Sequence, residues 1–126
     1  MIADLLTRIR NAQAVGKDTV KLRFSEFDFA LLKLLEENDY IHSAMKKGRG
    51  TKRYLEARLV YKDGAGAIHE IIQVSKPGRK VYIKWEEIRP YKRGFGIMVV
   101  STPRGLKIDK DARKLRVGGE IICKVW

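Results

Sequence analysis

Residues 96–105, Gly-Ile-Met-Val-Val-Ser-Thr-Pro-Arg-Gly, place a continuous apolar run directly before a polar turn. A short apolar run without alternation is typical of a strand that is buried on both faces, so Ile97–Val100 predicts a central strand. Ser101–Gly105 lacks this apolar character and contains Pro103, which cannot donate to a strand ladder. We therefore expect the second half of the chain to be organised around this strand and its turn.

Strands flank this central strand on both sides in the sequence. Lys80–Lys84 alternates, with Val81 and Ile83 on one face, and Ile121–Trp126 predicts a last strand. Turns are expected at Ser75–Gly78 and at Gly118-Gly119. Between them, Glu86–Arg93 predicts a polar connection that Pro90 interrupts, and Asp109–Leu115 predicts a short helix. Residues 75–126 are therefore expected to form a mostly β unit with one short helix.

The first half predicts a different order of elements. One apolar stripe at helical spacing ends before Gly16 and consists of Ile2, Leu5, Leu6, Ile9 and Ala12. Thr19–Phe24 alternates like a half-buried strand. A second helix is expected from about Glu26 to Asn38, with Ser25 as its N-cap and a buried face made by Phe27, Ala30, Leu31, Leu34 and Leu35.

The rest of the first half predicts two strands joined by a hairpin. Tyr54–Tyr61 and Ala67–Val74 are expected to pair antiparallel, because Asp63-Gly64 between them is a hairpin signal. Lys46–Arg53 has five basic residues and two glycines in eight positions and predicts a loop or a wide hairpin end. The chain is thus expected to be α+β, with two small packed subdomains: an α-β-α-β-β unit at 1–74 and a mostly β unit at 75–126.

The composition excludes several classes of protein. The chain has 126 residues, 44% of them hydrophobic, which suffices for a packed core and is unlike a disordered segment. The single cysteine, Cys123, excludes a disulfide scaffold. No apolar run approaches the ~20 residues that span a bilayer, and charged residues interrupt the first apolar pattern where a signal peptide would be continuous. These features predict a soluble, intracellular, strongly basic domain.

A formal net charge of +12 should attract polyanions, nucleic acid first and an anionic membrane surface second. Residues 1–73 carry 13 basic and 10 acidic side chains, whereas residues 74–126 carry 14 basic and 5 acidic ones. The second half, with a net charge of +9, is therefore the expected polyanion face. The alternative is a basic protein that its charge keeps soluble and that has no specific ligand.

Residue types that catalyse reactions or bind metals are sparse. His42 and His69 have no partner at metal-ligand spacing, and Cys123 lies in an apolar run typical of a small core residue. Gly94-Phe95-Gly96 lacks the third glycine and the following helix of a dinucleotide-binding loop. We expect neither an enzyme nor a bound cofactor.

The turn after the central strand is the best candidate binding site. Ser101 and Thr102 supply hydroxyls, while Thr102, Arg104 and Gly105 supply backbone N–H groups and Arg104 a guanidinium. These groups suit phosphate oxygens, 2′-hydroxyls and base edges. The alternative is an ordinary strand end with a Ser/Thr turn.

Basic and aromatic residues surround this turn in the sequence. Tyr82 alternates with two apolar residues, so it should face away from the core and stack on an unpaired base, whereas Trp85 is expected to pack. The cations expected to attract phosphates include Lys76, Arg79, Lys92 and Arg93. The first helix carries a polar ridge that could lie along a nucleic-acid backbone. This ridge consists of Arg8, Arg10 and Asn11.

Four ordered motifs together resemble the small-subunit ribosomal protein eight family in its bacterial form. They are ADLLTRIRNA at 3–12, VSKPG at 74–78, GIMVVSTPRG at 96–105 and GGEIIC at 118–123. The likeness runs from about Ile2 to Trp126. Position 103 is Pro where many members have Ser, Lys107 stands where the family is usually apolar, and Ile41–Arg53 matches poorly.

The resemblance implies a cytoplasmic protein of the ribosome that binds the central domain of the small-subunit ribosomal RNA early in assembly, beside neighbouring ribosomal proteins. It implies a two-part fold whose C-terminal part grips an irregular RNA helix and, in some members, the protein's own messenger RNA. The RNA-binding residues it carries over are Ser101, Thr102, Arg104, Gly105, Tyr82 and Glu120, and a second RNA-facing segment contains Thr7, Arg8, Arg10 and Asn11.

Glu120 lies within a basic region, so we expect it to orient a neighbouring Arg or Lys or to accept from a base amine. Taken together, the residues predict a clamp that holds one RNA helix with two faces. Two alternatives belong to other classes: a basic scaffold that acts mainly through protein contacts, and a DNA-binding module, for which the spacing of a helix-turn-helix or zinc finger is missing.

Overall fold

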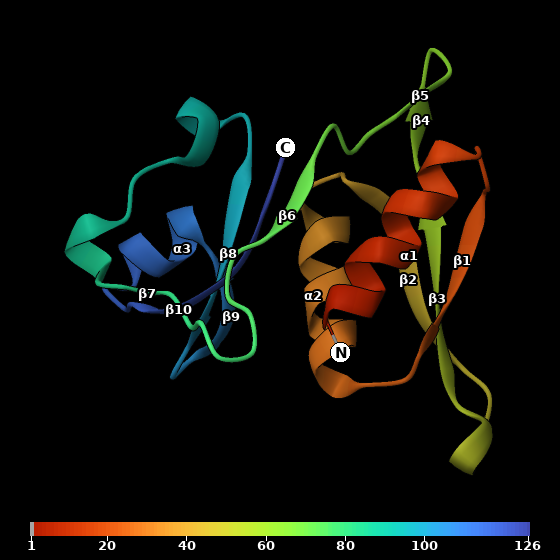
Figure 1. The fold of residues 1–126 in the computed structure, drawn as a ribbon, viewed down its shortest axis with the longest axis horizontal. Helices are drawn as coiled ribbons and strands as arrows, with labels where there is room; N and C mark the ends of the chain where they lie inside the picture. The colour runs from red at the N-terminus through yellow and green to blue at the C-terminus, as the bar shows by residue number, and fades with distance from the viewer. Residues whose placement is uncertain (1) are drawn as a thin grey trace. The chain divides into compact units, whose positions relative to one another are not determined.

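The computed structural model describes residues 2–126, which form a mixed α+β structure, as the sequence predicts (Figure 1). The chain divides into two compact units, one ending at Ile68 and the other comprising His69–Trp126. The sequence-based boundary, after residue 74, is six residues later than this observed division. The residues between the two positions include a short strand that pairs within the second unit. None of the helices within residues 2–126 is long and apolar enough to cross a bilayer.

The first unit consists of a three-stranded antiparallel sheet, two helices and a small hairpin. Its elements are α1 (Ile2–Ala14), β1 (Thr19–Arg23), α2 (Glu26–Glu37), β2 (Ile41–Lys47), η1 (Gly50–Lys52), β3 (Tyr54–Leu59), β4 (Tyr61–Lys62) and β5 (Ala65–Gly66). The sheet order is β1-β3-β2, and both α-helices lie on one side of it (Figure 1). The core of this unit lies between the helices and that side of the sheet.

The two helices follow local signals in the sequence. The predicted apolar stripe of α1 is buried at Leu5, Leu6, Ile9 and Ala12, and the chain turns out of the helix at Gly16, which has φ +72°. Ser25 caps α2 as predicted, because its Oγ accepts from the N–H of Asp28 at 3.4 Å.

The predicted buried face of α2 is partly wrong. The buried residues are Asp28, Leu31, Leu32 and Leu35, whereas Phe27 is 39% exposed. Ala30 is also exposed and Leu34 only half-buried. The helix is rotated because Leu31, Leu32 and Leu35 form the denser apolar stripe, and this stripe packs towards β2.

The predicted antiparallel pair in the first half is wrong. Tyr54–Leu59 pairs with β1 on one side and with β2 on the other, and β2 falls in a region where no strand was expected. The Asp63-Gly64 hairpin does form, with φ of +53° and +80° at its two central residues, but it joins only β4 and β5.

The second unit is built around a sheet in the order β6-β10-β8-β9, with β7 also paired to β10. Its elements are β6 (Ile71–Gln73), β7 (Tyr82–Ile83), η2 (Trp85–Glu87), η3 (Tyr91–Gly94), β8 (Ile97–Thr102), β9 (Gly105–Ile108), α3 (Asp109–Lys114) and β10 (Gly119–Val125). The central position of β8, the last strand and the short helix agree with the prediction.

The core of the second unit lies between one face of this sheet and α3. Its buried residues are Ile88, Met98, Val100, Ala112 and Ile121. Val81, Ile83, Trp85 and Tyr91 pack against them, so Trp85 packs as expected. The opposite face of β8 continues from buried Val99 to half-exposed Ser101, and there the candidate interface begins.

Candidate nucleic-acid interface

The turn after β8 closes a tight hairpin with β9, in which Thr102 pairs with Gly105. The Thr102 hydroxyl donates to the Gly105 carbonyl at 2.8 Å and accepts from the Arg104 N–H at 3.0 Å. The expectation that the Arg104 N–H is free for RNA is therefore wrong, because the Ser/Thr turn uses it. Gly105 has φ +100°, which a residue with a side chain rarely adopts.

The structure brings three of the predicted residues into one row across three strands. Ser101 of β8 lies opposite Glu120 of β10, and Glu120 lies opposite Tyr82 of β7. Directly paired residues of adjacent strands share a face of the sheet. Tyr82 is 70% exposed, so it faces away from the core as predicted. A hydroxyl, a carboxylate and an aromatic ring thus lie side by side, and we call Ser101, Glu120 and Tyr82 the polar row.

Glu120 forms an ion pair within this face. Its Oε2 lies 3.5 Å from Nζ of Lys80, and the Glu120 side chain is 22% exposed. Glu120 thus pairs with a neighbouring basic residue, which is one of the two alternatives expected for it, although sequence reasoning did not single out Lys80 as that residue. The signal was available, because Lys80 precedes Tyr82 by two positions and therefore shares its face.

The glycine pair before Glu120 allows the strands to approach one another. A Cβ at Gly119 would overlap the backbone carbonyl oxygen of Ser101, and a Cβ at Gly118 that of Ile83. Neither glycine has a positive φ, and the chain reverses instead at Arg116, with φ +57°. The prediction of a turn at Gly118-Gly119 is therefore wrong, since these residues are small in order to pack β10 between β7 and β8.

Lys76 and Arg79 lie on a separate turn that leads into β7. Their backbones pair, with N···O distances of 3.1 and 2.9 Å, and Gly78 between them has φ +78°. The buried Ser75 holds this turn to Val81, whose N–H donates to the Ser75 Oγ at 2.9 Å. Both cations are exposed and line a shallow groove of about 390 Å³ together with Lys124.

Lys92 and Arg93 lie at the opposite end of β8 from the polar row. Six strand residues separate η3 from the turn, which corresponds to roughly 20 Å. Both residues have left-handed backbones, with φ of +52° and +55°, and the buried Asp109 carboxylate anchors the segment by accepting from the Tyr91 N–H at 2.8 Å. Nζ of Lys92 lies 4.6 Å from the Trp126 ring centroid. This pair therefore forms a cationic patch distinct from the row.

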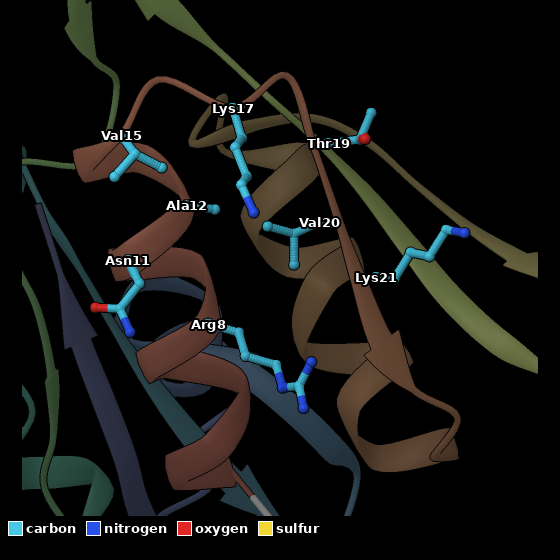
Figure 2. Close-up of a pocket in the computed structure, with 8 residues that line it drawn as sticks. All are labelled: Arg8, Asn11, Ala12, Val15, Lys17, Thr19, Val20 and Lys21. Carbon is cyan, nitrogen blue, oxygen red and sulfur yellow. The ribbon is translucent and has the colours of Figure 1, made fainter.

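The polar ridge of α1 is split by the helix geometry. Arg8 and Asn11 line a groove of about 580 Å³ between α1 and β1, together with Lys17, Thr19 and Lys21 (Figure 2). Thr7 and Arg10 are exposed on α1 but do not line this groove. Arg8 also pairs with Asp4 at 3.0 Å. Sequence reasoning missed Lys17, whose side chain points into the groove, whereas the Lys21 side chain points away from α1 (Figure 2).

Residues that could catalyse a reaction lie apart or are buried. Within residues 2–126 no group of three or more His, Cys, Asp or Glu side chains is arranged to hold a metal ion. Burial raises the pKa of Cys123 to about 12, so its thiol is protonated at neutral pH. The His69 ring stacks on Trp126 at a centroid distance of 5.0 Å.

Comparison with known proteins gives a consistent result over the whole chain. Residues 1–126 match the family described as Ribosomal protein S8. The chain is 43% identical over 127 residues to the small ribosomal subunit protein uS8 of Nautilia profundicola, covering 100% of this chain and 97% of that protein. It is 41% identical over 133 residues to the protein of the same name from Thermus thermophilus, covering 99% and 96%.

Proposed function

The chain belongs to the ribosomal protein S8 family, and from this premise we propose that it binds the central domain of the small-subunit ribosomal RNA through the polar row and its flanking turn. The family is structural and non-enzymatic, which agrees with the sequence-based expectation of no enzyme. As a member it is a structural constituent of the small ribosomal subunit, with ribosomal RNA and ribosomal proteins as its partners.

The polar row is the observation that carries this proposal. A-form RNA hides its base edges in a deep, narrow major groove, so a protein recognises an irregular helix through unpaired bases and 2′-hydroxyls. Tyr82 offers an exposed ring for stacking, which contributes about 1–3 kcal/mol per base. Ser101 offers a hydroxyl and Glu120 a carboxylate that Lys80 keeps oriented. Arg104 and Gly105 place a cation and a close backbone approach beside them.

Electrostatic attraction would supply most of the affinity. The second unit carries 14 basic and six acidic side chains, a net charge of +8. The exposed cations Lys76 and Arg79 on the turn before β7, and Lys92 and Arg93 in the separate patch at the other end of β8, suit phosphates rather than bases. If about five phosphates are neutralised, the logarithm of the binding constant falls with the logarithm of salt with a slope of about −4. Arg8, Asn11, Thr7 and Arg10 of the first unit belong to the same proposal as a second RNA-facing segment.

Two double variants separate these roles. Tyr82→Ala with Ser101→Ala should reduce discrimination between the ribosomal RNA site and a generic duplex, because both lost groups recognise unpaired nucleotides. Lys92→Ala with Arg93→Ala should weaken both RNAs about equally and flatten the salt slope by about 1.4 to 1.8. Gel-shift titrations over a salt series measure both effects. If the two double variants lose discrimination to the same extent, the polar row is not the specific element.

Binding to the chain's own messenger RNA is a further part of this proposal. A messenger segment that presents the same unpaired bases would occupy the same polar row, and ribosomal RNA would then compete with it. A competition titration should show mutually exclusive binding, with Tyr82→Ala weakening both RNAs. Simultaneous binding of both RNAs to one protein molecule would contradict a shared surface.

A further inference from the structure

The sheet of the first unit has one side without helices, and its charge is strongly biased. Both helices cover one side of this sheet (Figure 1). Leu22 and Leu55 are buried on that side, and alternate residues of the strands point the other way. We call this other side the outer face. Its charged and aromatic residues are Lys21, Arg23, Lys47, Tyr54, Glu56 and Arg58. They fall into cross-strand rows, with Lys21 opposite Glu56 and Arg23 opposite Tyr54.

Cations are concentrated on this face and at the adjoining hairpin end, residues 48–53. Of the 13 basic side chains in the first unit, four lie on the outer face and three, Arg49, Lys52 and Arg53, at the hairpin end. Only one of the unit's nine acidic side chains, Glu56, accompanies them. The remainder of the unit therefore has more acidic than basic groups, and its modest net charge conceals this separation.

Most of these cations are not neutralised inside the protein. Glu56 pairs with Lys47 at 3.0 Å, and Nζ of Lys21 lies 5.4 Å from the Tyr54 ring centroid. Across residues 2–126, by contrast, Arg23, Arg49, Lys52 and Arg58 make no side-chain ion pair. Four unpaired cations in one region repel each other, and an external polyanion relieves that repulsion.

The hairpin end has a defined shape. The Arg53 guanidinium lies 4.0 Å from the Phe24 ring centroid and its Nε donates to the Gly50 carbonyl at 3.2 Å. A Cβ at Gly48, which has φ +82°, would overlap the Lys52 carbonyl oxygen, so the turn closes tightly. The Arg53 guanidinium is therefore held in place before any partner arrives, which reduces the entropy cost of binding at this position.

We propose that the outer face and the hairpin end together form a second RNA-docking surface, which binds a phosphodiester backbone separately from the polar row. The chemistry favours RNA over a protein partner. The face is mostly polar or charged, with Met45 as an exposed apolar side chain, whereas the centre of a protein interface is apolar and depleted of charge. The edge strand β2 carries a bulge between Ile41 and Ser43, which disfavours addition of a partner's strand. This inference rests on the proposed function, because it concerns a protein already bound to ribosomal RNA.

Directed hydroxyl-radical cleavage tests the proposal. Because Cys123 is buried, an iron chelate can be tethered selectively to a new cysteine. Met45→Cys places the probe on the outer face, Glu37→Cys places it on α2 as a matched control, and Pro103→Cys places it on the turn beside the polar row. In reconstituted small subunits we expect strong RNA cleavage from position 45, weak cleavage from position 37, and cleavage of a different RNA segment from position 103.

The outcomes separate the two proposals. Cleavage from position 103 without cleavage from position 45 would overturn the second surface and leave the polar row intact. Equal cleavage from positions 37 and 45 would also overturn it, since proximity would then not depend on the charged face. Absence of cleavage from all three positions would contradict the proposed function itself.

A charge experiment supplies an independent readout. Arg23→Gln with Arg58→Gln should reduce the steepness of the log–log salt slope by about 1.4 to 1.8, the value for two lost phosphate contacts. Lys33→Gln with Lys62→Gln removes the same charge elsewhere in the first unit and should leave the slope unchanged. Thermal melting of both variants verifies folding. The same slope in both double variants would contradict a localised surface.

Discussion

Gly119→Ala should disrupt the polar row without touching any of its side chains. The added Cβ would overlap the Ser101 carbonyl oxygen and approach the Thr102 Cα, and both are backbone atoms that cannot move aside as a flexible side chain can. The substitution must therefore separate β8 from β10, which moves Ser101 away from Glu120 and Tyr82. Overpacking of this kind costs about 1–3 kcal/mol, and a lost ladder hydrogen bond adds about 1 kcal/mol.

Gly105→Ala is the matched control for this prediction. Gly105 also lies at the interface, but apart from its chain neighbours no atom lies within 4 Å of the Cβ that alanine would add. Alanine there costs only the strain of its positive φ, about 1–2 kcal/mol. Urea unfolding should therefore show a loss of about 2–4 kcal/mol for Gly119→Ala and a smaller loss for Gly105→Ala. Both variants must be folded under the binding conditions, which circular dichroism verifies.

RNA discrimination provides the second measurement. If the row acts as a unit, Gly119→Ala should lose the stacking contribution of Tyr82, about 1–3 kcal/mol, which corresponds to a loss of about 5- to 150-fold. Gly105→Ala should retain most of the discrimination, since the strand pairing beside Tyr82 is untouched. A folded Gly119→Ala protein with unchanged discrimination and a stability loss below about 0.5 kcal/mol would refute the role that we assign to strand spacing.

Three further predictions concern other parts of the chain. Thr102→Val should destabilise the turn by about 1 kcal/mol, whereas Thr102→Ser keeps both hydrogen bonds and should be neutral in denaturant unfolding. Asp39→Gly should raise the unfolding free energy by about 0.5–1 kcal/mol, because Asp39 ends α2 with φ +64° where glycine is unstrained. Burial raises the pKa of Cys123 to about 12, so the stability that the protonated thiol contributes is complete below about pH 9. The free energy of unfolding should decline from pH 9 to pH 12, by at most about 4 kcal/mol, and Cys123→Ala should lack this decline. A thiol reagent at pH 8 should react with Cys123 only after unfolding.

Local signals in the sequence were sufficient to predict several elements, although not the buried face of α2. The apolar run of β8, the stripe of α1 and the Ser25 cap all act within a few residues, and all three predictions were confirmed. Strand β2 was missed because the bulge between Ile41 and Ser43 interrupts its alternation and leaves only Ile41 and Ala44 buried.

Pairing between distant strands was not predictable from these signals. The Asp63-Gly64 turn suggested that its flanking strands pair with each other, yet β3 lies between β1 and β2, and β6 pairs with β10 about fifty residues later. The polar row is of the same kind. Its three members were singled out separately, but their adjacency depends on β10 lying between β7 and β8, which requires the small Gly118-Gly119 pair.

Summing charge along the sequence concealed the bias of the first unit. The net charge of residues 1–73 is only +3, and this value suggested that the second half alone attracts polyanions. A strand, however, presents alternate residues to opposite sides, so Lys21 and Arg23 share a face that the intervening Leu22 does not. Pairing then aligns Lys47 and Arg58 with them from two other strands. A polyanion interacts with the charge on a surface rather than in an interval of sequence, and a nearly balanced segment can therefore present a strongly cationic side.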